Sequence, residues 1–570
     1  MLKAYIEKAK QGQCVWLPDV RDALSGSSAA VPVIFSLTLC TGERIDRCHP
    51  VPKWRTQEER DFAAEYLNAC VFNTLALYSG RELCFYPAEK DGGVLQILRD
   101  LPTEFSPGGR SKCIKVARRI SRGFGGDGFQ FKIADISDYV PQAKIEEPVT
   151  ALTDKLRAAA EREKDCCSIG VDIGGTDIKL AAAKGDTLVC TKEFDWNPAE
   201  SGTAEEIIEP ILVLVRLMRA CLAAYGTEAF DKLKPALCKD ASVDEMRRAA
   251  EEAEESLGEK INVLDAAGIS FPDVCIRDRI IGGETPKTRG MRNNPAIDYE
   301  ADFARLTSLN ERIAALCRNG ARIRIINDGS MAAFTAAMEL AHGDGAALIG
   351  NGVIAHSLGT DIGSGWMTGE GVIPPIPLEM YDALLDLGSR AQREFPVRDL
   401  RSVRNENSGL PGVRRYMGQT AAFRLAYELK PALLQGFAEA EDGMIIVREK
   451  DPDKRKPCLE HLMTLAEQGD GEAQEIFRII GRTLGKVCRE MEFLLETGLD
   501  TRFLFGRFVK RARCIELLCE GCAETAPEIK LIAADSELAL TPLMRALDKS
   551  GTATVAQFGQ AVGSLYFAFV

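Results

Sequence analysis

Residues 168–183 read SIGVDIGGTDIKLAAA, in which two short apolar stretches flank the turn Gly174-Gly175-Thr176. The apolar stretches, 168–172 and 178–183, predict two strands that the glycine turn joins into a hairpin. Glycines lack Cβ atoms, so the backbone N–H groups of the turn can approach phosphate oxygens, and the Thr176 hydroxyl adds another donor. Taken alone, the same stretch is equally typical of an ordinary hairpin turn.

A second stretch farther along the chain repeats this arrangement. Residues 353–358 (VIAHSL) and 364–368 (SGWMT) predict two strands on either side of the turn Gly359-Thr360-Asp361-Ile362-Gly363. Here too the glycines permit a close approach of the backbone, and Thr360 offers a hydroxyl. Alternating strand and helix patterns around both hairpins predict an α/β fold with a duplicated architecture.

Between the hairpins, residues 322–340 (RIRIINDGSMAAFTAAMEL) change from a strand that ends at Ile326 to apolar residues at helical spacing. Asn327 and Asp328 therefore stand at a strand-to-helix turn. A carboxylate in that position is most often a helix N-cap, and it can also be a general base that faces a cleft. Two phosphate-type hairpins on either side of a strand-end carboxylate supply what phosphoryl transfer needs: a phosphate grip, a metal ligand and a base.

Composition and charge restrict the class of protein further. The 570 residues carry 84 acidic and 71 basic side chains, a formal net charge of −13, so we expect no nucleic acid as a partner. The sequence has no long apolar run, and its start MLKAYIEKAKQGQ lacks the apolar segment of a signal peptide. We therefore expect a cytoplasmic protein with no membrane partner. The 18 scattered cysteines predict reduced thiols.

The length of the chain predicts more than one domain. Residues 1–150 hold a predicted strand at 31–39 and a predicted helix at 60–77 but no motif that indicates a role. The charged, Ala-rich residues 146–165 predict a helical connector, and further helices are predicted at 204–224, 242–256 and 473–497. The expected organisation is an α+β accessory domain at 1–150, a connector at 151–165, an N-terminal lobe at 166–345 and a C-terminal lobe at 346–570.

The order and wording of the three motifs resemble those of the ROK sugar kinases, a branch of the hexokinase–actin superfamily that includes glucokinases. DIGGTDIK (172–179) and SLGTDIGSGW (357–366) resemble the family's two phosphate motifs, and INDGSMAAF (326–334) resembles its catalytic segment. Residues 266–283 and 476–509 extend the resemblance toward a substrate loop and an adenosine-binding turn. The resemblance implies a two-lobed actin-like (ribonuclease H-like) ATPase fold and ATP-dependent phosphorylation of a sugar hydroxyl. It leaves residues 1–150 unexplained.

The resemblance also implies roles for particular residues. Asp328 would deprotonate the acceptor hydroxyl, Asn327 would hydrogen-bond a neighbouring hydroxyl, and Asp172 would hold Mg²⁺ through water. Glu379 and Lys287 would contact the sugar. The implied ATP and phosphate contacts are Asp172, Gly174, Gly175, Thr176, Lys179, Gly359, Thr360, Gly363 and Gly506. The expected ligands are thus ATP, Mg²⁺ and a small sugar, and a homodimer is an open alternative for the oligomeric state.

Several positions depart from the family pattern. Lys287 occupies a sugar-contacting Asn position, where it would either favour an acidic or phosphorylated sugar or face the solvent. Glu379 and Asp382 stand where the family has Glu and, three residues later, His, and Asp361 places a carboxylate in the second phosphate turn. Arg507 replaces a second glycine after Gly506. The family's Cys-rich zinc loop has no counterpart, so we expect no zinc. These departures leave a second hypothesis open, a catalytically inactive sugar or nucleotide sensor with the same fold.

Overall fold

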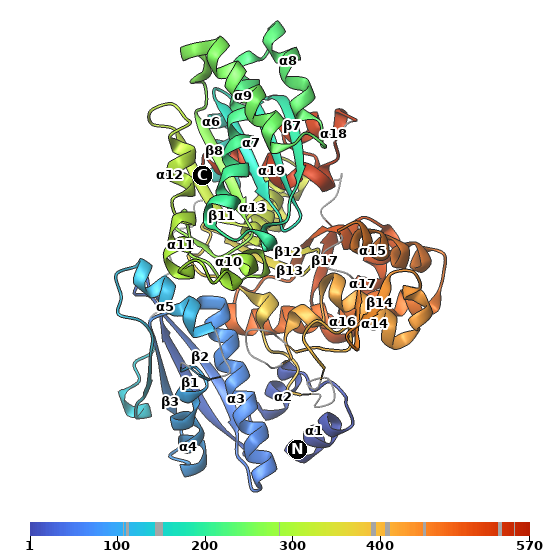
Figure 1. The fold of residues 1–570 in the computed structure, drawn as a ribbon. Helices are drawn as coiled ribbons and strands as arrows, with labels where there is room; N and C mark the ends of the chain where they lie inside the picture. The colour runs from blue at the N-terminus through green and yellow to red at the C-terminus, as the bar shows by residue number, and fades with distance from the viewer. Residues whose placement is uncertain are drawn as a thin grey trace.

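The structure of the chain is a computed structural model that contains an N-terminal domain and two further lobes (Figure 1). It describes residues 1–106, 108–109, 113–142, 152–283, 285–388, 395–404, 411–447, 452–533, 538–551 and 553–570. The predicted connector begins outside the described residues, and its described part is the helix α6 (Leu152–Glu163).

The first glycine hairpin lies inside the sheet of the first lobe, whose strand order is β11-β8-β5-β6-β7. The hairpin strands β5 and β6 are antiparallel, whereas β8 and β11 run parallel to β5. Small and apolar side chains fill these strands, as expected for a sheet covered on both faces. The strands are β5 (Cys167–Ile173), β6 (Asp177–Lys184), β7 (Thr187–Asp195), β8 (Ala266–Phe271) and β11 (Arg322–Asn327).

The second glycine hairpin has the same place in the sheet of the second lobe. The strand order there is β13-β12-β16-β17, with β12 antiparallel to β13 and parallel to β16. In each sheet the first hairpin strand is followed outward by later parallel strands, so the predicted duplication and the two-lobed ribonuclease H-like α/β fold are confirmed. The strands are β12 (Gly352–Leu358), β13 (Ile362–Thr368), β16 (Thr501–Gly506) and β17 (Lys530–Ala533).

Two helices pack between the sheets. The helix α13 (Asp328–Ala341) lies on β12 and β13, and α19 (Val555–Phe567) lies on β5 and β8. Gly268 lets α19 approach the sheet, since a Cβ atom there would overlap the Ser564 carbonyl oxygen. The helix α19 thus returns to the first lobe, where Figure 1 shows it beside the C-terminus. The domain boundary expected between residues 345 and 346 stays a prediction. The residues of α19 follow that boundary in sequence but pack on the sheet of the first lobe.

The remaining helices confirm the predicted periodicities. The predicted helices at 204–224, 242–256 and 473–497 form α7, α9 and α16, and each sits within two residues of its expected start. The helices α7 and α9 pack together on the outer side of the first lobe. The bounds are α7 (Ala204–Ala224), α8 (Glu228–Leu237), α9 (Val243–Leu257), α14 (Gly418–Leu429), α15 (Pro452–Glu467), α16 (Gly471–Leu495), α17 (Ala512–Thr525) and α18 (Pro542–Lys549).

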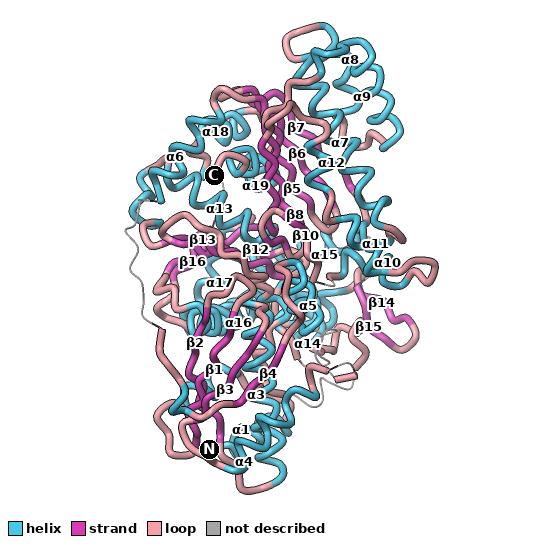
Figure 2. Tube along the Cα trace, turned by 90° about the vertical axis from the view of Figure 1, so that its left-hand side faces the viewer, coloured by secondary structure: helices cyan, strands magenta, loops and turns pink. Residues whose placement is uncertain are grey.

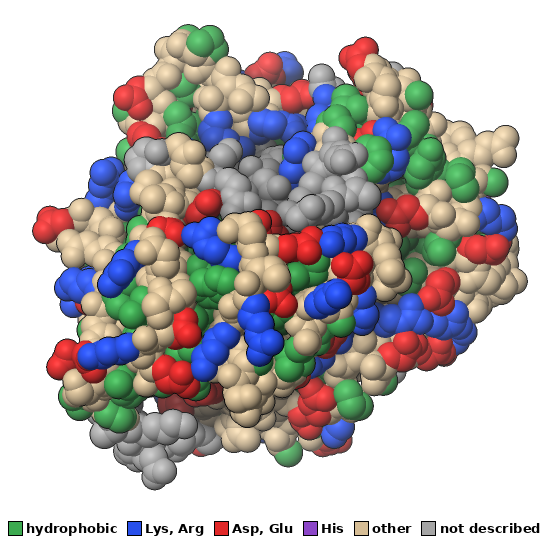
Figure 3. All heavy atoms as spheres, turned by 90° about the horizontal axis from the view of Figure 1, so that it is seen from below, with side chains coloured by type: hydrophobic (Ala, Val, Ile, Leu, Met, Phe, Trp, Pro, Cys, Tyr) green, Lys and Arg blue, Asp and Glu red, His purple; other side chains and the backbone are tan. Residues whose placement is uncertain are grey.

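The N-terminal domain is an α+β unit with the strand order β2-β1-β3-β4. Its predicted strand and helix form β1 and α3, and Figure 2 shows the sheet beside α3. On the face seen from below, acidic and basic side chains are interspersed (Figure 3). The elements are α1 (Leu2–Lys10), α2 (Leu17–Leu24), β1 (Ala30–Thr38), β2 (Arg44–Pro52), α3 (Gln57–Tyr78), β3 (Glu82–Pro87), α4 (Gly92–Asp100), α5 (Cys113–Gly123) and β4 (Gln130–Ile133).

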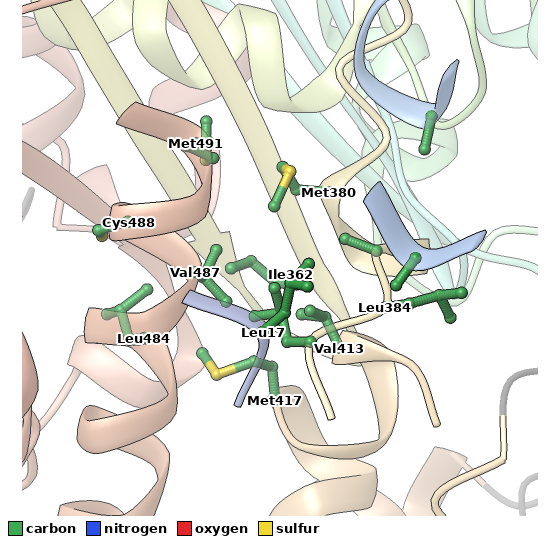
Figure 4. Packing of buried hydrophobic residues seen from close by; sticks show 14 of the residues in the cluster. Leu17, Ile362, Met380, Leu384, Val413, Met417, Leu484, Val487, Cys488 and Met491 are labelled. Carbon is green, nitrogen blue, oxygen red and sulfur yellow. The ribbon is translucent and has the colours of Figure 1, made fainter. Parts of the chain in front are cut away.

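This domain shares a continuous hydrophobic core with the second lobe. Leu17 of α2 is fully buried among side chains of β13, α16 and the segments around Met380 and Val413 (Figure 4). Burying apolar surface across the contact stabilises the docked arrangement by roughly 25 cal/mol per Å². The domain is therefore fixed to the second lobe rather than joined to it only through the chain.

A smaller contact joins the N-terminal domain to the first lobe. Arg119 of α5 forms an ion pair with Glu300 and lies over the rings of Tyr299 and Phe303, 5.5 and 5.7 Å from their centroids. Ile120 packs with apolar residues of the first lobe in a separate small cluster. The domain thus contacts both lobes.

All 18 cysteines have free thiols, as the sequence predicts. Cys514 and Cys522 are buried on α17, and Cys519 of the same helix is partly exposed. Among the described helices, none combines the length and the apolar character needed to cross a membrane.

Candidate active site

Three carboxylates gather at one edge of the first sheet. Asp172 lies near the end of β5 and is paired in register with Ser270, Asp273 follows the end of β8, and Asp328 follows the end of β11. The three strands are parallel neighbours, so their carboxyl ends meet at the same edge. Ligands of open α/β sheets bind at that edge.

Asn327, not Asp328, caps the helix α13. The Asn327 Oδ1 accepts a hydrogen bond from the N–H of Gly329 at 2.9 Å, and its Nδ2 donates to the Asp273 carbonyl at 3.1 Å. The segment alone favours Asp328 as the cap, and this expectation is wrong because the helix begins at Asp328 itself, one residue earlier than a cap at Asp328 requires. Asp328 lies in the first turn, where the helix dipole favours a negative charge.

The charge of Asp328 is set by opposing neighbours. Burial raises the pKa of Asp328 above its usual range, while Lys287 and the N–H of Gly329 oppose the rise. Burial likewise raises the pKa of Asp172 to about 6, against the effects of Lys179 and a 2.9 Å hydrogen bond from the Ser270 hydroxyl. Both carboxyl groups can therefore exchange protons at a higher pH than an exposed aspartate.

The two glycine turns flank Asp328. Lys287 lies against the first turn, since a Cβ atom on Gly175 would be 3.5 Å from its Cε. The second hairpin approaches Asp328 directly, since a Cβ atom on Gly363 would be 3.8 Å from Asp328 Oδ1. Thr176 is exposed at the tip of its turn. The structure thus brings both turns and the strand-end carboxylate together.

The other residues of the second turn form a tight loop. The N–H of Gly359 donates to the Asp361 carbonyl at 3.0 Å, and Thr360 is exposed at the tip. Gly506 ends β16 directly beside Leu358, with a φ of 98° and no room for a Cβ atom. The turn at Gly506, which is predicted to bind adenosine, therefore borders the second glycine turn at Gly359.

A cluster of cations surrounds Asp177, the residue after the first turn. Lys179 forms an ion pair with Asp177, and Lys456 of α15 lies 3.9 Å from its other oxygen. Although burial opposes it, Lys179 and Lys456 hold the pKa of Asp177 below its usual range. Burial lowers the pKa of Lys510, and the neighbouring Arg507 adds to this effect. Lys456 and Lys510 lie far from the motif in sequence, and no local pattern marks them.

Glu379 lies close enough to Asp328 for the two carboxyl groups to interact. Burial, followed by the neighbouring carboxylates Asp273 and Asp382, raises the pKa of Glu379 well above its usual range. The backbone N–H of Glu379 donates to the Ala76 carbonyl of α3 at 3.0 Å. The N-terminal domain thus anchors the segment that carries Glu379, a contact that the sequence pattern does not reveal.

A group of acidic side chains lies beside the first turn. One ligand atom from each of Asp177, Glu193 and Asp195 lies within 4.8 Å of the others, and these are the described residues that meet this condition. Lys239 lies 3.1 Å from Glu193 and 3.2 Å from Asp195, and Lys179 is paired with Asp177. The lysines already neutralise these carboxylates, so the group makes a poor metal site.

The fold and this edge define a two-lobed α/β protein of the ribonuclease H-like class, and solved structures of that class resemble it. A ROK family glucokinase from Streptomyces griseus in complex with glucose and AMPPNP is 18% identical, with a TM-score of 0.40 over 70% of this chain and 98% of that chain. A ROK hexokinase from Thermus thermophilus is 16% identical, with a TM-score of 0.37 over 67% and 97%. A glucokinase from Balamuthia mandrillaris in complex with glucose is 13% identical, with a TM-score of 0.37 over 69% and 97%. No family model and no curated protein matches the chain. The fold assignment rests on the strand order of the two sheets.

Proposed function

We propose that the chain is an ATP-dependent kinase that transfers a phosphoryl group to a sugar hydroxyl, with Asp328 as the general base. The observation that carries the proposal is the position of Asp328 between the two glycine turns, 3.8 Å from the Cβ position of Gly363 and next to Lys287. Phosphoryl transfer depends mainly on positioning and charge stabilisation, and this edge offers both.

Asp328 would accept the proton of the acceptor hydroxyl. Its raised pKa makes it a stronger base than an exposed aspartate, and the N-terminus of α13 stabilises the ionised form that must be present first. Asn327 has one N–H and one lone pair left after its two hydrogen bonds, which is sufficient to contact a neighbouring hydroxyl. Glu379, whose carboxyl group interacts with that of Asp328, would bind further hydroxyl groups.

The phosphates would lie along the two turns. The Gly175 backbone N–H is the proposed donor, with the exposed hydroxyls of Thr176 and Thr360. Gly174 and Gly359, whose N–H groups donate within their own turns, would let the backbone approach the phosphates closely. The cations around Asp177 would neutralise the phosphate charge: Lys179, Lys456, Arg507 and Lys510. Lys287 lies between the first turn and Asp328, where negative charge increases during the transfer.

Asp172 is suited to hold Mg²⁺ through water. It is a hard oxygen ligand beside the first turn, and its pKa of about 6 results first from burial, a cost that a nearby cation would offset. A magnesium ion held by Asp172 through water would supply positive charge that neutralises the phosphates. Ser270 fixes the carboxylate by its hydrogen bond to Oδ1.

A coupled assay of ADP release over a panel of sugars tests the proposal. We expect sugar-stimulated turnover that Asp328→Asn lowers by about 10²–10⁴-fold, because the base is lost. The matched control is Asp186→Asn, a change of the same kind at an exposed turn of the first lobe. Full activity in Asp328→Asn, or no turnover with any sugar, would contradict a kinase that uses this base.

A second candidate function is an inactive sensor that binds a sugar or nucleotide. Asp361 favours it, because a carboxylate in the second turn repels a phosphoryl group unless a cation screens it. Calorimetry separates the two candidates, since a sensor binds sugar or ATP and releases no ADP. In that case Asp361→Asn is expected to tighten ATP binding.

A further inference from the structure

The helix α3 of the N-terminal domain ends against the segment that carries Glu379. The last carbonyl groups of a helix have no hydrogen-bond partner within that helix. In α3 the carbonyl of Ala76 accepts a hydrogen bond from the N–H of Glu379 at 3.0 Å, and the carbonyl of Leu77 accepts one from the N–H of Leu378 at 2.9 Å. Two residues of the second lobe therefore complete the C-terminal end of α3.

A fully buried asparagine of the same helix holds a second point of this segment. The Oδ1 of Asn73 accepts a hydrogen bond from the N–H of Leu384 at 2.7 Å, and its Nδ2 donates to the Leu384 carbonyl at 3.1 Å. The Nδ2 also donates to Glu490 Oε1 at 2.9 Å, so both of its N–H groups are used. Asn73 thus fixes Leu384 through both backbone groups of that residue.

Residues around the start of α2 bind the far end of the same segment. The N–H of Leu17 donates to the Leu385 carbonyl at 2.7 Å, and the N–H of Leu387 donates to the Val15 carbonyl at 2.8 Å. These bonds form a short antiparallel pairing between the two stretches of chain. Residues 378–387 are therefore bound to the N-terminal domain at both ends and in the middle.

The backbone of this segment has a conformation that its own residues do not favour. Leu378 has a φ of 54°, in the left-handed region that a leucine rarely adopts. Such a conformation persists where surrounding contacts fix it, and here the N–H of Leu378 is bound to α3. Leu378 and Met380 are buried, whereas Glu379 between them is partly exposed. The N-terminal domain therefore sets the course of the backbone from which the Glu379 side chain extends.

The same segment lies beside the proposed base. Its short 3-10 helix η7 (Met380–Asp382) contacts both α3 and β13. On β13, a Cβ atom at Gly363 would be 3.8 Å from Asp328 Oδ1. Glu379 directly precedes η7, and its carboxyl group interacts with that of Asp328. A series of direct contacts thus joins the N-terminal domain to the place where the acceptor would bind.

We propose that the N-terminal domain is part of the acceptor site, with Asn73 as a positioning residue that sets the affinity for the sugar through Glu379. The inference rests on the proposed function, and it assigns a role to a domain that the resemblance to sugar kinases leaves unexplained. The two glycine turns belong to the hairpins of the lobes themselves. Asn73 should therefore affect the binding of the sugar and leave the binding of ATP unchanged.

Calorimetry on the full chain tests the inference. The chain is titrated with glucose, mannose, galactose and their N-acetylamino counterparts, and separately with AMPPNP. For the sugar that binds most tightly, we expect Asn73→Ala to raise the Kd about tenfold or more, because a displaced Glu379 loses charge-assisted hydrogen bonds to hydroxyl groups. The Kd for AMPPNP should stay within about twofold, since changes at separate sites act independently.

A purely structural role of Asn73 would give a different result in the ADP-release assay. Loss of folded protein lowers the apparent kcat and leaves both KM values unchanged, whereas a positioning role raises the KM for the sugar and leaves kcat and the KM for ATP unchanged. The matched control is Asn68→Ala, which truncates another buried asparagine of α3, one whose Oδ1 has no partner among the described residues. It should keep the sugar affinity of the unmodified chain.

Hydrogen exchange on the unmodified chain provides a test that needs no variant. The N–H groups of Leu378, Glu379 and Leu384 are bound to α3, so a sugar held by Glu379 should slow their exchange. AMPPNP alone should leave the exchange of residues 378–387 unchanged. This measurement remains decisive if Asn73→Ala fails to fold.

Four outcomes would overturn the inference. They are an unchanged sugar Kd in Asn73→Ala, equal weakening of sugar and AMPPNP, unchanged exchange of residues 378–387 when sugar is added, and absence of binding by every sugar. Failure of the kinase proposal appears separately, as sugar binding that depends on Asn73 without release of ADP.

Discussion

The ammonium of Lys456 lies 3.9 Å from the Asp177 carboxylate, so an ion pair joins α15 of the second lobe to the first residue of β6. Asp177 follows the first glycine turn directly, where the phosphates of ATP are proposed to bind. A bound triphosphate would compete with Asp177 for the same cations. The pair therefore links nucleotide binding to a contact between the lobes.

Opposite effects on ATP affinity are expected from the two members of this pair. Lys456→Ala removes a phosphate contact and should weaken ATP binding by about tenfold, since a charge-assisted hydrogen bond contributes about 1.5–3 kcal/mol. Asp177→Asn removes a competing anion and should tighten binding. Titration with a fluorescent ATP analogue measures both, and Lys530→Ala, on the exposed end of β17, is the control. Weakening by both changes would contradict competition between Asp177 and phosphate.

The neighbours Asn327 and Asp328 should separate stability from activity. Asn327→Ala removes the cap of α13 and should cost about 1 kcal/mol in the free energy of unfolding. Asp328→Asn leaves the cap in place, so it should lower activity with a change in stability below that value. Urea unfolding and the ADP assay measure the two quantities. A larger loss of stability in Asp328→Asn would assign the cap to Asp328 instead.

Glu163 should make stability depend on pH. Burial raises the pKa of Glu163 to about 8 in the folded chain, and the Ser168 hydroxyl donates to its Oε1 at 3.0 Å. Between the unfolded pKa of 4.5 and this value the folded state binds more protons, so stability falls as pH rises through the window. A pKa unit corresponds to about 1.4 kcal/mol, so the change is on the order of 5 kcal/mol.

Glu163→Gln removes this titration and is expected to be more stable than the unmodified chain above pH 8. Thermal unfolding from pH 5 to 9 compares the two proteins, and their difference cancels the effects of other carboxyl groups. Parallel curves for the two proteins would show that the pKa of Glu163 is the same in the folded and unfolded states.

The docking of the N-terminal domain depends on a buried ion pair. Glu490 of α16 binds Arg21, and accepts a hydrogen bond from Asn73 at 2.9 Å. The Arg21 guanidinium also lies 3.7 Å from the Phe493 ring centroid. Glu490→Ala leaves a buried, unpaired arginine and should cost about 3–5 kcal/mol in the free energy of unfolding. Urea unfolding measures the loss, and Glu472→Ala, in the exposed first turn of the same helix, is the control. A cost below 1 kcal/mol would mean that the domain undocks easily.

Local patterns were sufficient to predict the hairpins and the strand before Asp328. Period-two and helical spacing are properties of neighbouring residues, and the turns Gly174-Gly175 and Gly359-Thr360 interrupt them plainly. The N-cap of α13 was predicted wrongly because Asn and Asp are both common N-cap residues. The position at which the helix begins, Asp328 or Gly329, decides which of the two is the cap. The hydrogen bond from Asn327 to the Asp273 carbonyl, which favours the observed choice, joins residues on different strands.

Other residues of the site could not be predicted from the sequence, because contacts between distant parts of the chain bring them there. Lys456 reaches Asp177, and Lys510 lies near Lys179, only because the second lobe faces the first turn. The Asp273 Oδ2 has no hydrogen-bond partner among the described residues, because the N–H groups of Val274 and Gly283 both donate to Oδ1. The contact of residues 1–150 with the segment of Glu379 uses the backbone carbonyl of Ala76 in α3. A backbone carbonyl is present at every residue, so this contact leaves no motif in the sequence.

The contact of one domain with both lobes has a mechanical consequence. A hinge that opens the two lobes must either stretch the Arg119–Glu300 pair of α5 or carry the whole N-terminal domain along with it. The rate of a catalytic cycle that includes such a movement would then depend on this ion pair, which lies outside the proposed site. In the proposed kinase, a change at this contact, outside both lobes, would then alter how fast product leaves.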